Sequence, residues 1–133
     1  MKLQVSIATP CWLLLGLAAC TDPAPRDGAG ACYAYTGRGD TIQISLTSSE
    51  GEVAGEMDYA LAEKDRNSGT LAGEWNGDTL YARYTFRSEG VTSEREVAFL
   101  RRGDGLVEGY GTPSAGEWDF PGGMLLTPVG CTE

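Results

Sequence analysis

Apolar and polar residues alternate along most of the chain after residue 32. In the segment 41–47, three large aliphatic residues alternate with polar ones, and the same two-residue period returns in 52–61 and 79–87. A period of two with one apolar face is typical of an antiparallel strand that packs one side on a core. The pattern therefore predicts half-buried strands, and no stretch has the period of an amphipathic helix.

Further strands are expected at 32–36, 70–75, 95–101, 106–111, 118–120 and 124–129. The buried face of 95–101 is not assignable, because four consecutive residues within it are apolar. Polar segments rich in Gly, Asp and Asn separate the strands and favour turns. Asn76-Gly77-Asp78 is the strongest hairpin signal, since Asn-Gly tolerates positive φ. The segments 62–69 and 88–93 are expected to be longer polar loops.

Eight or nine strands spaced about 8 to 12 residues apart predict an all-β fold with an antiparallel up-and-down meander. Closing the sheet removes exposed edges, so we expect a closed or nearly closed barrel of about eight strands. A short repeat matches 51–58 with 69–76 and places Gly55 and Gly73 in mid-strand. Such a Gly marks a bend or a close approach of another backbone, as curved sheets require.

The first 31 residues follow a different pattern. Met1-Lys2 precedes an apolar run that ends at Leu17-Ala18-Ala19-Cys20. A charged start, a short apolar run and small residues at its end indicate a secretory signal. The run is well short of the roughly 20 residues that a membrane-spanning helix needs. Residues 21–31 are rich in Pro, Gly and Ala, which indicates a flexible linker. We therefore assign 1–19 as signal peptide, 20–31 as the cysteine and linker, and 32–133 as the barrel domain.

Leu17-Ala18-Ala19-Cys20 resembles the lipobox of bacterial lipoproteins. The resemblance implies cleavage before Cys20, a diacylglycerol thioether on its sulfur and often acylation of the new amine, for example with palmitate. Two or three acyl chains anchor a protein stably in a membrane. In enterobacterial lipoproteins a Thr at the position of Thr21 accompanies sorting to the outer membrane. A lipid-anchored protein of the bacterial envelope, at the outer membrane, is thus expected; an ordinary secretory signal with a chance Cys is the alternative.

Charge and cysteine content restrict the partners. Cleavage before Cys20 would leave 133 − 19 = 114 residues, enough for one domain with one core. Removal of Lys2 would leave 9 basic and 19 acidic residues, a charge of −10 that disfavours binding to nucleic acid. In an exported protein the remaining pair, Cys32 and Cys131, indicates a disulfide. Two free thiols are the alternative.

The chain offers little catalytic chemistry. It has no His, which is the commonest general base and metal ligand. No nucleophile motif such as G-x-S-x-G occurs, and none of the 19 acidic residues is singled out as a catalytic pair. We expect a binding or structural protein, with no enzymatic activity, no metal site and no cofactor.

Two groups of residues are candidates for binding. The inward faces of the predicted strands carry four aromatic residues, which either contact a ligand or simply fill the core: Tyr59, Trp75, Tyr84 and Phe86. In a meander, alternate loops lie at the same end, so 62–69 and 88–93 should share a rim. The candidate rim residues are Lys64, Asp65, Arg66, Glu89 and Arg95. A salt-bridged rim that only orders the loops is the alternative.

The strand pattern and the phrase Asn76-Gly77-Asp78-Thr79-Leu80-Tyr81-Ala82 resemble lipocalin-like and avidin-like barrels, and the chain is similar to small bacterial lipoproteins of uncharacterised function. The resemblance implies the fold and a lipocalin-like carrier of a small, partly apolar ligand. The alternative is a protein-binding or inhibitor lipoprotein, such as those that inhibit lysozymes, whose acidic surface steers a basic partner. A cavity on the order of a few hundred Å³ favours the carrier, whereas a filled interior with an acidic rim favours the inhibitor.

Overall fold

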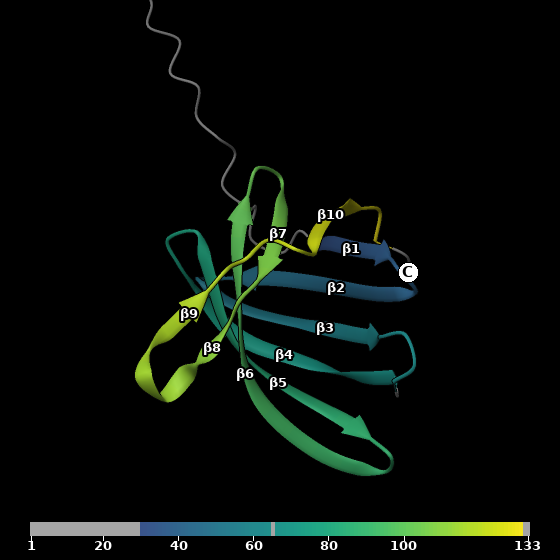
Figure 1. The fold of residues 1–133 in the computed structure, drawn as a ribbon. Coiled ribbons are helices and arrows are strands. Elements are labelled where there is room, and N and C mark those ends of the chain that lie inside the picture. Colours follow the sequence, from purple (N-terminus) through teal and green to yellow (C-terminus); the bar gives the residue numbers. More distant parts are fainter. Residues whose placement is uncertain (1–29, 65, 132–133) are drawn as a thin grey trace, which may run out of the picture.

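Eight antiparallel strands close into a barrel in the computed structural model, which describes residues 30–64 and 66–131 (Figure 1). The strands follow one another around the wall in the order β1-β10-β7-β6-β5-β4-β3-β2. The predicted all-β, antiparallel meander with about eight strands in a closed barrel is therefore confirmed. Among the described residues, no helix is long and apolar enough to cross a membrane.

The barrel strands are β1 (Ala31–Gly37), β2 (Asp40–Ser49), β3 (Glu52–Ala60), β4 (Arg66–Asn76), β5 (Thr79–Ser88), β6 (Val91–Arg102), β7 (Gly105–Glu108) and β10 (Leu125–Val129). Between β7 and β10 the chain forms a separate two-stranded hairpin. Its strands are β8 (Tyr110–Thr112) and β9 (Glu117–Asp119), with the short 3-10 helix η1 (Pro113–Ala115) between them. Figure 1 shows this hairpin beside the barrel wall.

Two predicted loops are shorter than expected. β4 begins at Arg66 and β6 begins at Val91, so half of 62–69 and most of 88–93 is strand. These strand ends are polar and largely exposed, and their backbones are paired with β3 and β5. A polar composition does not prevent strand formation where neighbouring strands supply the backbone hydrogen bonds. The β5–β6 connection is a two-residue turn, Glu89-Gly90, in which both residues have positive φ.

The expected single strand over 106–111 is wrong. It is divided at Gly109, where β7 ends and the chain leaves the barrel for the β8–β9 hairpin. A Cβ at Gly109 would lie 2.6 Å from the Phe120 ring, so the lack of a side chain allows the returning chain to pack closely here.

Inward-facing side chains from most of the barrel strands fill much of the interior. A single cluster of buried residues forms this core: Ile42, Ile44, Leu46, Val53, Met57, Tyr59, Leu71, Leu80, Ala82, Tyr84, Val97, Phe99, Leu106 and Leu126. The wall is tightly curved where glycines face inward. A Cβ at Gly73 would lie 2.0 Å from the Tyr81 carbonyl oxygen, and one at Gly55 would lie 2.2 Å from that of Ser45. The predicted close backbone approach at the mid-strand glycines is therefore confirmed.

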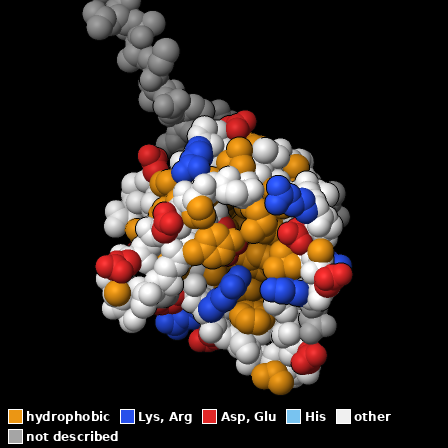
Figure 2. All heavy atoms as spheres, viewed as in Figure 1, with side chains coloured by type: hydrophobic (Ala, Val, Ile, Leu, Met, Phe, Trp, Pro, Cys, Tyr) orange, Lys and Arg blue, Asp and Glu red, His pale blue; other side chains and the backbone are white. Residues whose placement is uncertain are grey.

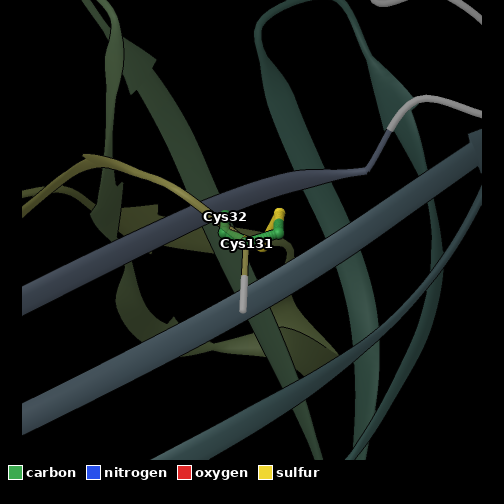
Figure 3. Close-up of a disulfide and its surroundings, with 2 residues drawn as sticks. All are labelled: Cys32 and Cys131. Atoms are coloured by element: carbon green, nitrogen blue, oxygen red, sulfur yellow. A yellow bond between two sulfur atoms is a disulfide. The ribbon is translucent and has the colours of Figure 1, made fainter. Parts of the chain in front are cut away.

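A disulfide joins Cys32 of β1 to Cys131, which follows β10 (Figure 3). The two Cα atoms are 5.2 Å apart, and Cys32 pairs with Val129 across the β1–β10 seam. Both the predicted disulfide and the adjacency of the first and last barrel strands are confirmed. The bond ties together the two strands whose pairing closes the barrel.

The barrel has two different ends. One end carries the disulfide and the β2–β3, β4–β5 and β6–β7 turns; we call it the base. Gly30, the first described residue, also lies there, beside Cys131. The other end carries the β1–β2 turn, the β3–β4 loop and the β5–β6 turn; we call it the mouth. The assigned signal peptide, Cys20 and most of the linker lie outside the described residues.

Candidate ligand-binding site

A pocket of about 150 Å³ lies in the mouth of the barrel. β3, β4, β6 and β7 form its walls, together with the β3–β4 loop and the segments around β8 and β10. Its lining residues are Tyr59, Leu61, Lys64, Asn67, Arg95, Glu108, Tyr110 and Met124. Figure 2 shows hydrophobic side chains gathered in a hollow on one face of the molecule, with Lys and Arg side chains at its edge.

A buried carboxyl group lies in this pocket. Glu108 is only 6% exposed, and among the described residues it is the one charged side chain in the buried class. Strand alternation places Glu108 on the same inward face of β7 as Leu106. The Tyr59 hydroxyl, from β3, donates a hydrogen bond to Glu108 Oε1. Arg95 Nη2, from β6, lies 3.6 Å from the same oxygen. The carboxyl group is thus held between a donor and a cation.

Burial controls the ionisation of the two hydrogen-bonded groups. Desolvation raises the pKa of Glu108 above its usual value, although the Tyr59 hydrogen bond and the Arg95 charge act in the opposite direction. Desolvation, reinforced by the adjacent Glu108 carboxylate, raises the pKa of Tyr59. The Tyr59 hydroxyl therefore keeps its proton and remains the hydrogen-bond donor.

Aromatic rings surround the Arg95 guanidinium. Its central carbon lies 5.1 Å from the Tyr59 ring centroid, 5.6 Å from that of Tyr84 and 6.0 Å from that of Phe86. Cation–π attraction holds a guanidinium in such a position. The Tyr84 and Phe86 rings are themselves stacked, with centroids 4.9 Å apart, and the Tyr84 hydroxyl donates to the Met57 carbonyl oxygen at 3.0 Å. Burial raises the pKa of Tyr84 to about 12. These packed and hydrogen-bonded rings therefore hold the Arg95 guanidinium in position.

Arg95 nevertheless remains accessible, because its side chain is 49% exposed. A guanidinium carries five N–H donors in a planar fork, and the contact with Glu108 leaves most of them for another group. Lys64 from the β3–β4 loop is exposed and lines the same pocket. The mouth therefore presents two cationic donors.

The pocket also contains a hydrogen-bond acceptor that no described residue donates to. Asn67 Oδ1 is buried and has no hydrogen-bond partner among the described residues. A buried polar atom that is left unpaired costs about 1–3 kcal/mol. An N–H or O–H group in the pocket would satisfy it.

The structure separates the four aromatic candidates. Tyr59, Tyr84 and Phe86 lie together around Arg95. Trp75 also belongs to the barrel interior, but it lies one residue before the end of β4 at the base. There the Arg101 guanidinium carbon lies 4.0 Å from the Trp75 ring centroid. Trp75 is therefore not part of the mouth pocket.

The rim candidates are also divided. Lys64 and Arg95 line the same pocket. Arg66 instead has its Nη2 3.9 Å from Asp58 Oδ1, an exposed pair on neighbouring strands. Glu89 lies in the β5–β6 turn and does not line the pocket. Asp65 lies outside the described residues.

Five residues of the pocket are not among the candidates from the sequence. Two are apolar, Leu61 and Met124, and three are polar, Asn67, Glu108 and Tyr110. Glu108 has a usable signal, because it shares the inward face of its strand with Leu106 two positions earlier. Asn67 likewise precedes Gly69 and Leu71 at two-residue intervals, but the polar residues around it favour a loop. Tyr110 follows Glu108 at the same two-residue interval within the predicted strand 106–111.

Comparisons of the chain with protein-family models, curated proteins and solved structures found no match. The small closed barrel with a pocket at one end is consistent with a lipocalin-like binding protein.

Proposed function

We propose that the protein is a lipid-anchored protein of the bacterial envelope that binds a small organic acid in the mouth of its barrel. One observation carries the binding proposal. The mouth pocket combines two accessible cationic donors, Arg95 and Lys64, with the unpaired buried acceptor of Asn67.

The size of the pocket limits the ligand. The core fills most of the barrel, and the pocket of about 150 Å³ is smaller than the few hundred Å³ expected for a carrier of larger apolar molecules. A protein cavity of about this volume holds a molecule of the size of benzene. The ligand is therefore a short molecule and not a long-chain lipid.

The polar groups define its chemistry. The planar guanidinium of Arg95 matches the geometry of a carboxylate, and Lys64 adds a second positive charge. The free Asn67 oxygen requires a hydroxyl or amine on the same ligand. Leu61 and Met124 offer a small apolar surface on the pocket wall. A short hydroxy or amino carboxylic acid satisfies these groups together.

Anchoring at Cys20 suits this site. Gly30 lies ten positions after Cys20, which gives a reach of at most roughly 35 Å. Gly30 lies at the base, so a tether attached there leaves the mouth at the far end of the barrel. Cys20→Ser is expected to abolish incorporation of a fatty-acid analogue in the producing cell. Equal labelling of the variant and the wild type would contradict lipidation at Cys20.

The binding proposal is tested with short organic acids and the purified full-length mature protein. Thermal-shift screening selects a ligand, and isothermal titration calorimetry measures its dissociation constant. Arg95→Gln is expected to weaken binding roughly 10- to 100-fold, because hydrogen bonds to charged groups contribute about 1.5–3 kcal/mol. Arg87→Gln is the matched control, because Arg87 is an exposed residue of β5 outside the pocket. The proposal is wrong if no short acid binds, or if both variants weaken binding equally.

A further inference from the structure

A second, larger hollow lies outside the barrel. It is an open groove of about 890 Å³ across the outer wall formed by β2 to β6, with Trp118 of β9 at its side. The groove has about six times the volume of the mouth pocket and shares none of its lining residues. The site proposed at the mouth therefore does not account for it.

Small side chains and aromatic rings shape the groove. Ala54 of β3 lies directly opposite Ala72 of β4, so this part of the groove floor has no bulky side chain. Tyr81 is 40% exposed, and its ring centroid lies 6.4 Å from that of Trp118. A shallow floor beside two aromatic rings is suited to a segment of chain with protruding side chains. Aromatic residues are also enriched among those that dominate binding energy at protein interfaces.

Two acidic residues in the groove lie opposite each other and repel, which destabilises the barrel. Glu52 of β3 lies directly opposite Glu74 of β4, and like charges at such a position are destabilising. Neither carboxylate has an ion-pair partner in the described part of the chain. Glu96 also lines the groove, and Arg83 opposite it is the single basic residue of the lining. Three acidic residues and one basic residue give the groove a net charge of −2.

We infer that this groove docks a basic, extended segment of a partner protein. Lys or Arg side chains of such a segment would relieve the repulsion between Glu52 and Glu74. A cation beside Tyr81 or Trp118 would gain cation–π attraction. The whole chain has a net charge of −9, which steers a basic partner towards it before contact. Charge complementarity and the two aromatic rings together define this partner.

The test uses the full-length mature protein and a labelled ten-residue peptide rich in Lys and Arg, with an uncharged peptide of equal length as a comparison. Fluorescence anisotropy measures binding at physiological salt. Replacing Glu52 and Glu74 together with Gln is expected to weaken binding of the basic peptide tenfold or more. It should not lower the melting temperature, because it removes a repulsion.

The matched control replaces Glu56 and Glu94 with Gln. Both are exposed acidic residues outside the groove, so the net charge changes equally. This control should change the affinity less than threefold. Trp118→Ala should also weaken binding of the basic peptide. None of these variants should alter the binding of an acid in the mouth pocket.

Three outcomes would overturn the inference. The basic peptide does not bind at physiological salt, or both double variants weaken binding equally, which indicates only general attraction between charges. In the third outcome, sedimentation shows a dimer of this chain that the Glu52 and Glu74 replacements abolish, so that a second copy occupies the groove.

Discussion

Replacing Cys32 and Cys131 with Ser should lower the free energy of unfolding by on the order of 4 to 5 kcal/mol at 25 °C. The disulfide joins residues separated by 99 positions in the sequence, so it closes a loop of 131 − 32 + 1 = 100 residues. In the chain-entropy model, closing a loop of this length removes about 16 cal/mol/K from the unfolded chain, which is about 4.7 kcal/mol. This value is an upper figure, since measured effects are often smaller.

Urea unfolding followed by circular dichroism measures the effect. Each kcal/mol corresponds to roughly 4–8 °C in a domain of this size, so the melting temperature should fall by at most roughly 20–40 °C. The m-value should rise, because an unfolded chain without the cross-link exposes more surface to urea. Adding a reductant to the wild type should reproduce the variant, and the same reductant should leave the Ser variant unchanged.

One result would show that loop closure in the unfolded chain is not the source of this stabilisation. A loss of less than about 1 kcal/mol, together with an unchanged m-value, would mean that the cross-link does not act on the unfolded chain. The native contacts between β1 and β10 would then hold the seam without help from the bond.

Three further changes test the core and the mouth. Gly69→Ala should lower the free energy of unfolding by about 1–3 kcal/mol in urea titrations, because its Cβ would lie 2.0 Å from a β5 carbonyl oxygen. Gly123→Ala is the control and should cost almost nothing, because no atom lies within 4 Å of its Cβ. Equal losses in the two variants would contradict this explanation. Tyr84→Phe should cost about 0.5–1.5 kcal/mol in the same assay, because it removes the hydrogen bond to the Met57 carbonyl, and an unchanged midpoint would refute this. Burial raises the pKa of Glu108, so the native state binds a proton that the unfolded state has already released, and stability should fall as pH rises from about 4.3 through the raised value. Glu108→Gln should remove this fall from melting curves, and the same slope in both proteins would show that Glu108 is not its source.

The strand pattern was predictable where one face of the wall meets water. In β2 and β5, apolar residues alternate with polar ones, and the structure places the predicted faces inward. The pattern fails in β6, where Ala98 faces outward and is still fully buried. The chain between β7 and β10 returns over this part of the wall. The Trp118 ring centroid lies 6.4 Å from that of Tyr81, which is directly opposite Ala98 in the sheet, and Arg102 Nη2 donates to the Phe120 carbonyl at 3.4 Å. A strand covered on both faces loses its two-residue period.

The mouth pocket was predictable only in part. The meander order alone places the β3–β4 loop and the β5–β6 turn at one end, which correctly grouped Lys64 with the mouth. The bond between Tyr59 and Glu108 joins residues 49 positions apart, on strands that are not neighbours in the sheet. Alternation shows that a residue faces inward, but it does not show which side chain lies across the interior. That information depends on the curvature and register of the closed barrel.

The disulfide at the base also determines how the barrel responds to mechanical force. Cys32 is the second residue of β1, so a pull through the segment before Gly30 reaches the bond almost at once. The bond transmits part of the tension to Cys131, which follows β10, so β1 cannot separate from β10 one residue pair at a time. Both strands must instead be loaded together against their neighbours, β2 and β7. Unfolding under such a pull would therefore begin elsewhere in the wall, and the base would be the last part of the barrel to open.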